Sequence, residues 1–144
     1  MSPRELYVAE PPPRYWTRPP LVLDCSVLAA ALFEEEAREN SQRQIAANEL
    51  HAPYVLQSEV AHVALKKLAG GFEEIARAGL KDLQNISIDL HRIQEEPVFE
   101  LAAKYKLSAY DASYLWLAGF LKAPLATYDQ RLAKAARLHL AGLP

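Results

Sequence analysis

Residues 21–26 read Leu-Val-Leu-Asp-Cys-Ser, an apolar run that ends at the carboxylate of Asp24. A short continuous apolar run is typical of a strand buried on both faces, as in a parallel sheet covered by helices. Residues 124–127 form a second short apolar run, and Asp129 follows it. The two runs predict buried strands that lead into acidic residues.

Strands and helices alternate along the rest of the chain. Apolar spacing predicts one or two helices over residues 26–50 and further helices over residues 58–68, 72–83, 95–105, 108–121 and 129–140, with strands over residues 51–56 and 86–90. Alternation of this kind gives parallel strand pairing with helices on both sheet faces. We therefore expect the α/β class, with a parallel sheet sandwiched by helices.

The first twenty residues differ from the remainder. Six of the ten prolines lie there, which excludes a regular helix or a central strand. We expect a proline-rich N-terminal arm over residues 1–20 and a single domain over residues 21–144. Tyr15 and Trp16 indicate that the arm packs on its own domain or on a partner subunit.

The charge, the cysteine content and the apolar segments of the sequence limit the possible substrates and the cellular location. A net charge of -2 provides no general basic field, so an RNA substrate would need local Lys and Arg side chains. The single cysteine, Cys25, lies in an apolar run and is interpreted as a core residue in a reducing compartment. The N-terminus lacks the pattern of a signal peptide, and the apolar stretch 109–121 is too short to span a bilayer. We expect a cytoplasmic protein with no membrane association.

Four carboxylates stand where predicted strands end or helices begin. Asp24 and Asp129 close the two clearest strands, and Glu59 and Asp111 open two helices. Strand ends and helix starts of a parallel sheet gather along one edge, where ligands bind. The four acids are 35, 52 and 18 residues apart in sequence, yet the fold predicts that they converge.

Each acid also fits a purely structural role. Asp24 and Asp129 could cap the helices that follow them. Glu59 in a first helical turn would suit the helix dipole. The segment Ser108-x-x-Asp111 resembles a capping box. These roles stay open for each residue, but converging carboxylates repel one another and are costly without a cation.

The donor types favour a hard cation. Oxygen ligands in a partly open site are what Mg²⁺ or Mn²⁺ prefers. The sequence shows no Cys/His cluster for zinc. The pair Glu59-x-x-His62 has di-iron spacing, but such sites use two pairs and one occurs here. We expect Mg²⁺ or Mn²⁺ as the cofactor.

Four segments together resemble a known family. In order and approximate spacing they are similar to the signature segments of PIN-domain nucleases, most closely those of VapC-type toxins from bacterial toxin–antitoxin pairs. The segments are 21–26 (Leu-Val-Leu-Asp-Cys-Ser), 58–61 (Ser-Glu-Val-Ala), 107–112 (Leu-Ser-Ala-Tyr-Asp-Ala) and 125–129 (Leu-Ala-Thr-Tyr-Asp). The resemblance extends from Leu21 to about Leu140.

The resemblance implies a metal-dependent endoribonuclease that is inhibited by a cognate antitoxin protein. Its catalytic set would be Asp24, Glu59, Asp111 and Asp129, with the three aspartates as metal ligands. Ser26 and Thr127 match hydroxyl positions that support the site. Cys25 departs from the family, because a small residue or Thr is expected there, and the arm precedes a strand that usually begins the chain.

The predicted reaction is hydrolysis of RNA phosphodiester bonds. A cation held mainly by Asp24 and Asp111 would polarise the phosphate and lower the pKa of a bound water. A phosphatase or phosphotransfer α/β domain is one alternative, although a haloacid-dehalogenase-type site needs a second aspartate where Ser26 stands. A PIN-like binding partner without activity is the other.

Two further expectations concern partners. Local bases to hold RNA are Lys66, Lys67, Arg131 and Lys134. The predicted helix around Leu115, Trp116 and Phe120 is apolar nearly all round, so it is either central or an interface, and a homodimer contact there is one of the two interpretations.

Overall fold

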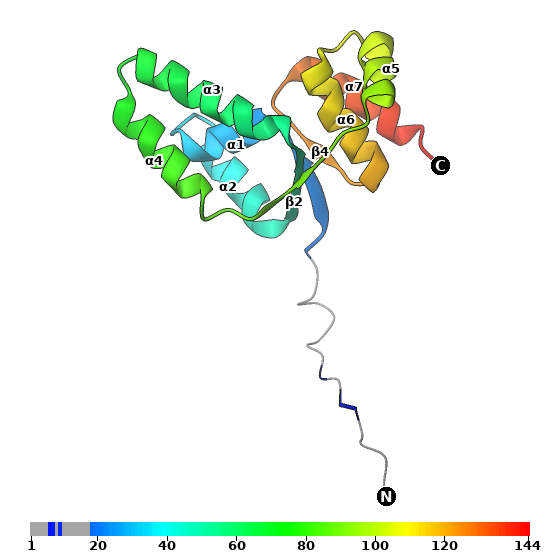
Figure 1. The fold of residues 1–144 in the computed structure, drawn as a ribbon, viewed down its shortest axis with the longest axis horizontal. Coiled ribbons are helices and arrows are strands. Elements are labelled where there is room, and N and C mark those ends of the chain that lie inside the picture. Colours follow the sequence, from blue (N-terminus) through cyan, green and yellow to red (C-terminus); the bar gives the residue numbers. More distant parts are fainter. Residues whose placement is uncertain (1–5, 8, 10–17) are drawn as a thin grey trace, which may run out of the picture.

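A computed structural model of the chain describes residues 6, 7, 9 and 18–144. Strands and helices alternate through the described part (Figure 1). In chain order the elements are β1 (Pro20–Leu23), α1 (Cys25–Leu32), α2 (Arg38–Ala47), β2 (Glu49–Pro53), α3 (Val55–Ala69), α4 (Glu73–Leu83), β3 (Ile88–His91), α5 (Glu95–Tyr105), α6 (Ala109–Leu121), β4 (Leu125–Ala126) and α7 (Gln130–Ala141).

The four strands form one parallel sheet in the order β3-β2-β1-β4. Val22 in β1 pairs with His51 on one side and with Leu125 on the other. The chain adds β2 and β3 on one side of β1 and then places β4 on the opposite side. The strand order therefore reverses between β1 and β4, which is the position where open α/β sheets form a ligand crevice.

Helices cover both faces of the sheet. Helices α1 to α4 pack together on one side, and α5 to α7 lie on the other side (Figure 1). Helix α6 contacts β1, β2 and β4. The predicted α/β fold with a sandwiched parallel sheet is confirmed.

Burial follows the apolar pattern. Val22 and Leu23 are inaccessible to solvent, and every residue of α1 except Ser26 is buried. The prediction of a doubly buried first strand is therefore confirmed. In α6, Leu115 is also fully buried, so of the two interpretations of this helix the central one applies to this side, which packs on the sheet.

Several boundaries differ from the sequence-based expectation. Strand β1 begins at Pro20, because a proline at the first strand position needs no N–H in the ladder. Strand β2 begins at Glu49 and ends at Pro53, and α3 starts at Val55 instead of Ser58. Among the described residues, no helix has the length and apolar character needed to span a bilayer. The expected packing of Tyr15 and Trp16 lies outside the described residues.

Candidate active site

Asp24 lies directly after β1, beside the point where the strand order reverses. Its backbone N–H donates to the carbonyl oxygen of Ala126 at 3.0 Å, which places Asp24 against the end of β4. The side chain is buried, with 5% of the residue exposed. Although Asp24 is the N-cap residue of α1, its carboxylate makes no capping bond within the described residues. The capping interpretation of this carboxylate is wrong.

Two hydroxyl groups hold the Asp24 carboxylate instead. Ser26 Oγ donates to Asp24 Oδ2 at 2.8 Å, and Thr127 Oγ1 donates to the same oxygen at 2.9 Å. Ser26 Oγ also accepts from the N–H of Tyr128, and Thr127 Oγ1 accepts from the N–H of Asp129, each at 3.0 Å. A hydroxyl has one proton to donate and accepts with its oxygen lone pairs. Because the N–H groups occupy the accepting sides of Ser26 and Thr127, each hydroxyl directs its single proton to Asp24 Oδ2. Neither hydroxyl donates to Oδ1, which is left to another partner.

Glu59 lies in the second turn of α3, not in the first turn as expected, because the helix begins at Val55. Its Oε1 accepts a hydrogen bond of 2.5 Å from the Tyr114 hydroxyl of α6. Tyr114 is fully buried, and burial together with the bond to Glu59 raises the pKa of its phenol. Tyr114 therefore stays protonated and acts as a fixed donor.

Sequence reasoning did not identify Tyr114. A signal was available, because Tyr114 follows Asp111 by three residues and side chains at that spacing share a helix face. The tyrosine lies in the predicted helix 108–121, whose apolar pattern indicates a central or interface position. Its contact with Glu59 spans 55 residues of sequence and depends on how α3 and α6 pack.

Asp111 opens α6 with its carboxylate half-buried. The cap of the helix is Ser108, whose Oγ accepts from the N–H of Asp111 at 3.0 Å. Burial raises the pKa of the Asp111 carboxyl, and the charges of Asp24 and Asp129 raise it further. Ser108 and the Arg131 guanidinium oppose this rise. The charges of Asp24 and Asp129 therefore reach the Asp111 carboxyl, and the Ser108 hydroxyl caps the helix.

Asp129 has the structural role that the sequence also allowed. Its Oδ1 accepts from the N–H of Leu132 at 2.9 Å and caps α7. The residue is exposed. It is nevertheless close enough to raise the pKa of Asp111. Capping uses one oxygen, so Asp129 can still offer the other to a ligand.

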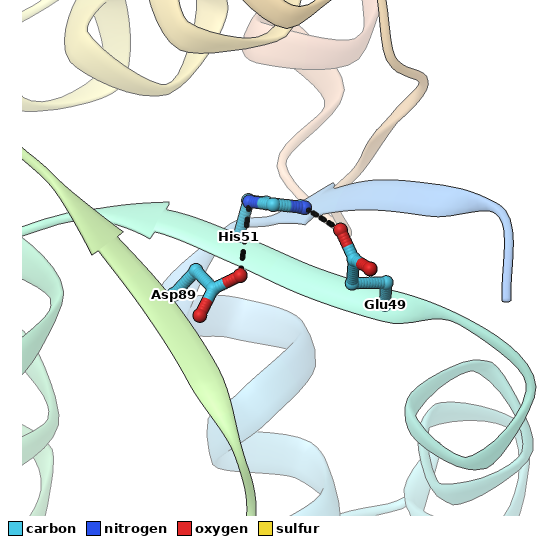
Figure 2. A group of neighbouring side chains, drawn as sticks. All are labelled: Glu49, His51 and Asp89. Atoms are coloured by element: carbon cyan, nitrogen blue, oxygen red, sulfur yellow. Dashed lines mark hydrogen bonds and ion pairs between the residues drawn. The ribbon is translucent and has the colours of Figure 1, made fainter. Parts of the chain in front are cut away.

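The four acids act on one another electrostatically. Burial raises the pKa of Glu59, and the charges of Asp24 and Asp111 add to this rise, whereas the Tyr114 hydrogen bond opposes it. The structure therefore brings together acids from four separate segments at one edge of the sheet. Their oxygens do not close into a tight cage: among the described residues, three possible ligand atoms lie within 4.8 Å of one another only at Glu49, His51 and Asp89, on β2 and β3 (Figure 2).

The wider spacing of the four acids fits a hydrated cation. Mg²⁺ usually keeps several waters and binds through one or two carboxylates. Asp24 and Asp111 offer carboxylate oxygens here, and no sulfur or nitrogen donor competes from the same set. Cys25 lies beside them, but burial and the charges of Glu59 and Asp24 raise its pKa to about 12. It remains a thiol, in agreement with its predicted place in the core.

Two hollows flank the acids. One, of about 430 Å³, lies beside Glu59 and includes Cys25, His62 and Tyr110 among its lining residues. The other, of about 470 Å³, is basic and is lined by Lys104, Tyr105, Lys106, Arg131, Lys134, Ala135 and Leu138. Arg131 connects the basic hollow to the acids, because its charge lowers the pKa of Asp111.

The four expected RNA-binding bases are separated in the structure. Arg131 and Lys134 line the basic hollow. Lys66 and Lys67 lie in the last turn of α3, about two helical turns from Glu59. Lys67 Nζ is 3.7 Å from Glu35 Oε1, so it already has an acidic partner.

The chain is similar to several known proteins. The PIN domain family matches residues 21–138. Ribonuclease VapC3 of Pyrobaculum aerophilum is 33% identical over 121 residues, which cover 79% of this chain and 92% of that protein. Ribonuclease VapC9 of Mycobacterium tuberculosis is 35% identical over 118 residues, or 78% and 88% of the two chains. The crystal structure of PAE2754 from Pyrobaculum aerophilum superposes with a TM-score of 0.66 at 19% identity, covering 86% of this chain and 94% of that chain, and supports the fold.

The raised pKa of Asp111 gives a test in the absence of metal. A carboxyl whose pKa is raised by folding stabilises the protein below its usual pKa of about 4, and this stabilisation is lost as the pH rises through the folded-state value. At pH 7 in EDTA we therefore expect Asp111→Asn to melt no lower than the wild type, because one repelling charge is gone and the Ser108 cap remains. Excess Mg²⁺ or Mn²⁺ should stabilise the variant less than the wild type.

Thermal melts with EDTA and with excess metal measure both effects. Asp82→Asn, an exposed substitution on α4, is the matched control and should respond to metal as the wild type does. If Asp111→Asn were less stable in EDTA and still gained as much from metal, Asp111 would have only a structural role.

Proposed function

The chain belongs to the PIN-domain family, and we propose that it is a metal-dependent endoribonuclease of the VapC type. The observation that carries this proposal is the Asp24 carboxylate, which two hydroxyls hold by one oxygen at the point where the strand order reverses. The charge of Asp24 raises the pKa of both Glu59 and Asp111, and the charge of Asp129 raises that of Asp111. Such a set supports phosphodiester hydrolysis with Mg²⁺ or Mn²⁺.

Asp24, Asp111 and Asp129 would hold the cation in this proposal. Asp24 would use Oδ1, because Ser26 and Thr127 occupy Oδ2. Asp129 would use the oxygen that does not cap α7. When bound, the ion supplies charge stabilisation of the phosphate and a lower pKa for an attacking water.

Glu59 would orient that water in this proposal. Tyr114 fixes its Oε1, which leaves Oε2 to accept a hydrogen bond. In the reaction the water oxygen forms a bond to phosphorus and its proton passes to Glu59. The bond from phosphorus to the leaving oxygen breaks, and that oxygen takes a proton from solvent. Tyr114 is a positioning residue, since it acts through Glu59.

The basic hollow would hold the RNA backbone beside the acids. It contains four cationic side chains within a protein whose net charge is -2. A local basic surface of this kind satisfies the requirement that an acidic nuclease must still attract a polyanion. Tyr110 is exposed at the opposite hollow and offers an aromatic face to a base.

The proposed partners follow from the same family. We propose a cognate antitoxin protein as the inhibitor, and the cytoplasm, where the buried Cys25 thiol would stay reduced. A haloacid-dehalogenase-type phosphatase would need a second carboxylate at position 26. Ser26 stands there and donates a hydrogen bond to Asp24, so the phosphatase alternative has no support. A purely binding role leaves the joint placement of the four acids unexplained.

Substitution of Asp24 tests the activity. We expect the purified chain to cut single-stranded RNA with Mg²⁺ or Mn²⁺ and not in EDTA, and Asp24→Asn to lower the rate at least 100-fold. The reason is that the amide removes the charge that would hold the cation. Cleavage of a labelled RNA is the readout, and circular dichroism shows whether the variant is folded. Asp82→Asn should cut normally. Full activity in EDTA, or in folded Asp24→Asn, would disprove the metal-nuclease proposal.

Paired lysine substitutions test the basic hollow. The double variant Lys104→Ala/Lys134→Ala removes two charges there, so RNA binding should weaken and the slope of log K against log salt should fall by about 1.4. The matched control, Lys66→Ala/Lys67→Ala, removes two charges at the far end of α3 and should change the slope little. Fluorescence anisotropy over a salt series measures both. Equal effects of the two variants would mean that the hollow is not the binding surface.

We also propose a homodimer contact on the outer side of α6. Trp116 and Phe120 stack there with ring centroids 5.1 Å apart, and 63% of Phe120 is exposed. Sedimentation at micromolar concentration should show a dimer for the wild type and a monomer for Phe120→Asp. Phe99→Asp changes an equally exposed aromatic on α5 and should leave the dimer intact. If the wild type is a monomer, the proposal of a dimer contact on α6 is wrong.

A further inference from the structure

A second group of metal-ligating side chains lies on β2 and β3, away from the catalytic acids. Glu49 and His51 are two residues apart on β2, so they point to the same face of the sheet. Asp89 on β3 is the register partner of His51 and shares that face. Figure 2 shows the His51 ring between the two carboxylates. His91, two residues further along β3, completes the group.

The hydrogen bonds of His51 determine which of its nitrogens can bind a ligand. Nε2 is 2.7 Å from Glu49 Oε1 and must donate, because an ionised carboxylate only accepts. The lone pair of the neutral ring is therefore on Nδ1. This nitrogen faces His91 Nε2 at 2.9 Å and Asp89 Oδ2 at 3.9 Å.

Two of the three separations between the proposed donor atoms are close to those of a transition-metal site. In tetrahedral zinc sites with nitrogen and oxygen donors about 2.0–2.1 Å from the ion, neighbouring donor atoms are about 3.3 Å apart. The distances of 2.9 and 3.9 Å lie on either side of that value. His91 is not in the group of described residues whose ligand atoms all lie within 4.8 Å of one another, so the exposed Asp89 side chain would rotate toward His91 when an ion binds. A carboxylate that accepts from the far nitrogen of a ligating histidine is also the usual outer partner in such sites.

The exposure of these side chains and the types of donor atom also favour a transition-metal ion. The His51 side chain is 10% exposed, whereas those of Glu49 and Asp89 are 49% and 65% exposed, so the buried nitrogen is reached past exposed carboxylates. Burial and the neighbouring His51 lower the pKa of His91, and the charge of Asp89 opposes this fall. Mixed nitrogen and oxygen donors suit Zn²⁺ better than Mg²⁺.

We propose that His51 Nδ1, His91 Nε2 and Asp89 Oδ2 form a second metal site for Zn²⁺ or an ion of similar chemistry, with Glu49 as the positioning residue. The proton that His91 Nε2 donates to His51 moves to His91 Nδ1 by exchange with water, so both ligating nitrogens are free without net proton release. Three protein ligands leave the fourth position open to water. An ion there would join the edge strand β3 to β2. This site is independent of the proposed nuclease activity.

Cobalt binding to the full chain tests the proposal. After removal of metal with EDTA and desalting, one equivalent of Co²⁺ should give the intense visible absorption of a four-coordinate ion. One equivalent of Zn²⁺ should abolish it, and a large excess of Mg²⁺ should not. His91→Gln and Asp89→Asn should each weaken Co²⁺ binding at least tenfold, and Glu49→Gln should weaken it 10- to 100-fold. Both Asp89 and Glu49 are exposed, so these variants keep the test valid if a histidine variant fails to fold.

Two controls identify the source of the signal. His62→Gln removes an exposed histidine on α3, and Asp24→Asn removes a catalytic acid; both should bind Co²⁺ as the wild type does. Zinc should also raise the melting temperature of the wild type more than that of His91→Gln. Unchanged Co²⁺ affinity in both Asp89→Asn and His91→Gln would overturn the proposal, and the four residues would then be a hydrogen-bonded group alone. Loss of the signal in Asp24→Asn would overturn it as well, by assigning the ion to the acidic site.

Discussion

Two hydroxyl groups on one oxygen of Asp24 join the segments that follow β1 and β4, which carry Asp24 and Asp129. Ser26 lies at the start of α1 and Thr127 just after β4, and each uses its single proton on the same carboxylate oxygen. Backbone N–H groups of the loop before α7 fix both hydroxyls in turn. The loop that carries Asp129 is therefore held against the end of β1, and one oxygen of Asp24 remains directed to another partner. Loss of either hydroxyl would loosen both the loop and the carboxylate.

The surrounding acids make this edge of the sheet electrostatically unfavourable without a counter-charge. Burial and mutual repulsion raise the pKa values of Glu59 and Asp111, and nearby Tyr114 and Arg131 oppose the effect only in part. The fold tolerates this strain because the β1 and α1 residues beneath it are almost wholly buried. A well-packed core can hold repelling groups in place.

The sheet carries two sets of donors with different chemistry. At the edge where the strand order reverses, carboxylates and hydroxyls provide oxygen alone, which favours hard cations. On the face of β2 and β3, two imidazoles add nitrogen to a carboxylate, which favours borderline ions such as Zn²⁺. His51 of β2 is the register partner of Val22 of β1, two residues before Asp24. A single strand register therefore positions both sets.

The sequence by itself determined the secondary structure and the sheet type, which depend on local patterns of residues. Apolar runs and helical spacing predicted the α/β alternation, the parallel sheet and the gathering of Asp24, Glu59, Asp111 and Asp129 at strand ends and helix starts, because periodicity and chain direction act over a few residues. Tertiary structure decided the contacts between distant segments. The Tyr114–Glu59, Thr127–Asp24 and His51–His91 contacts span 55, 103 and 40 residues. Only the packing of α6 on the sheet and the pairing of β2 with β3 bring these side chains together, so no local pattern could specify their distances or which polar partner each group would find.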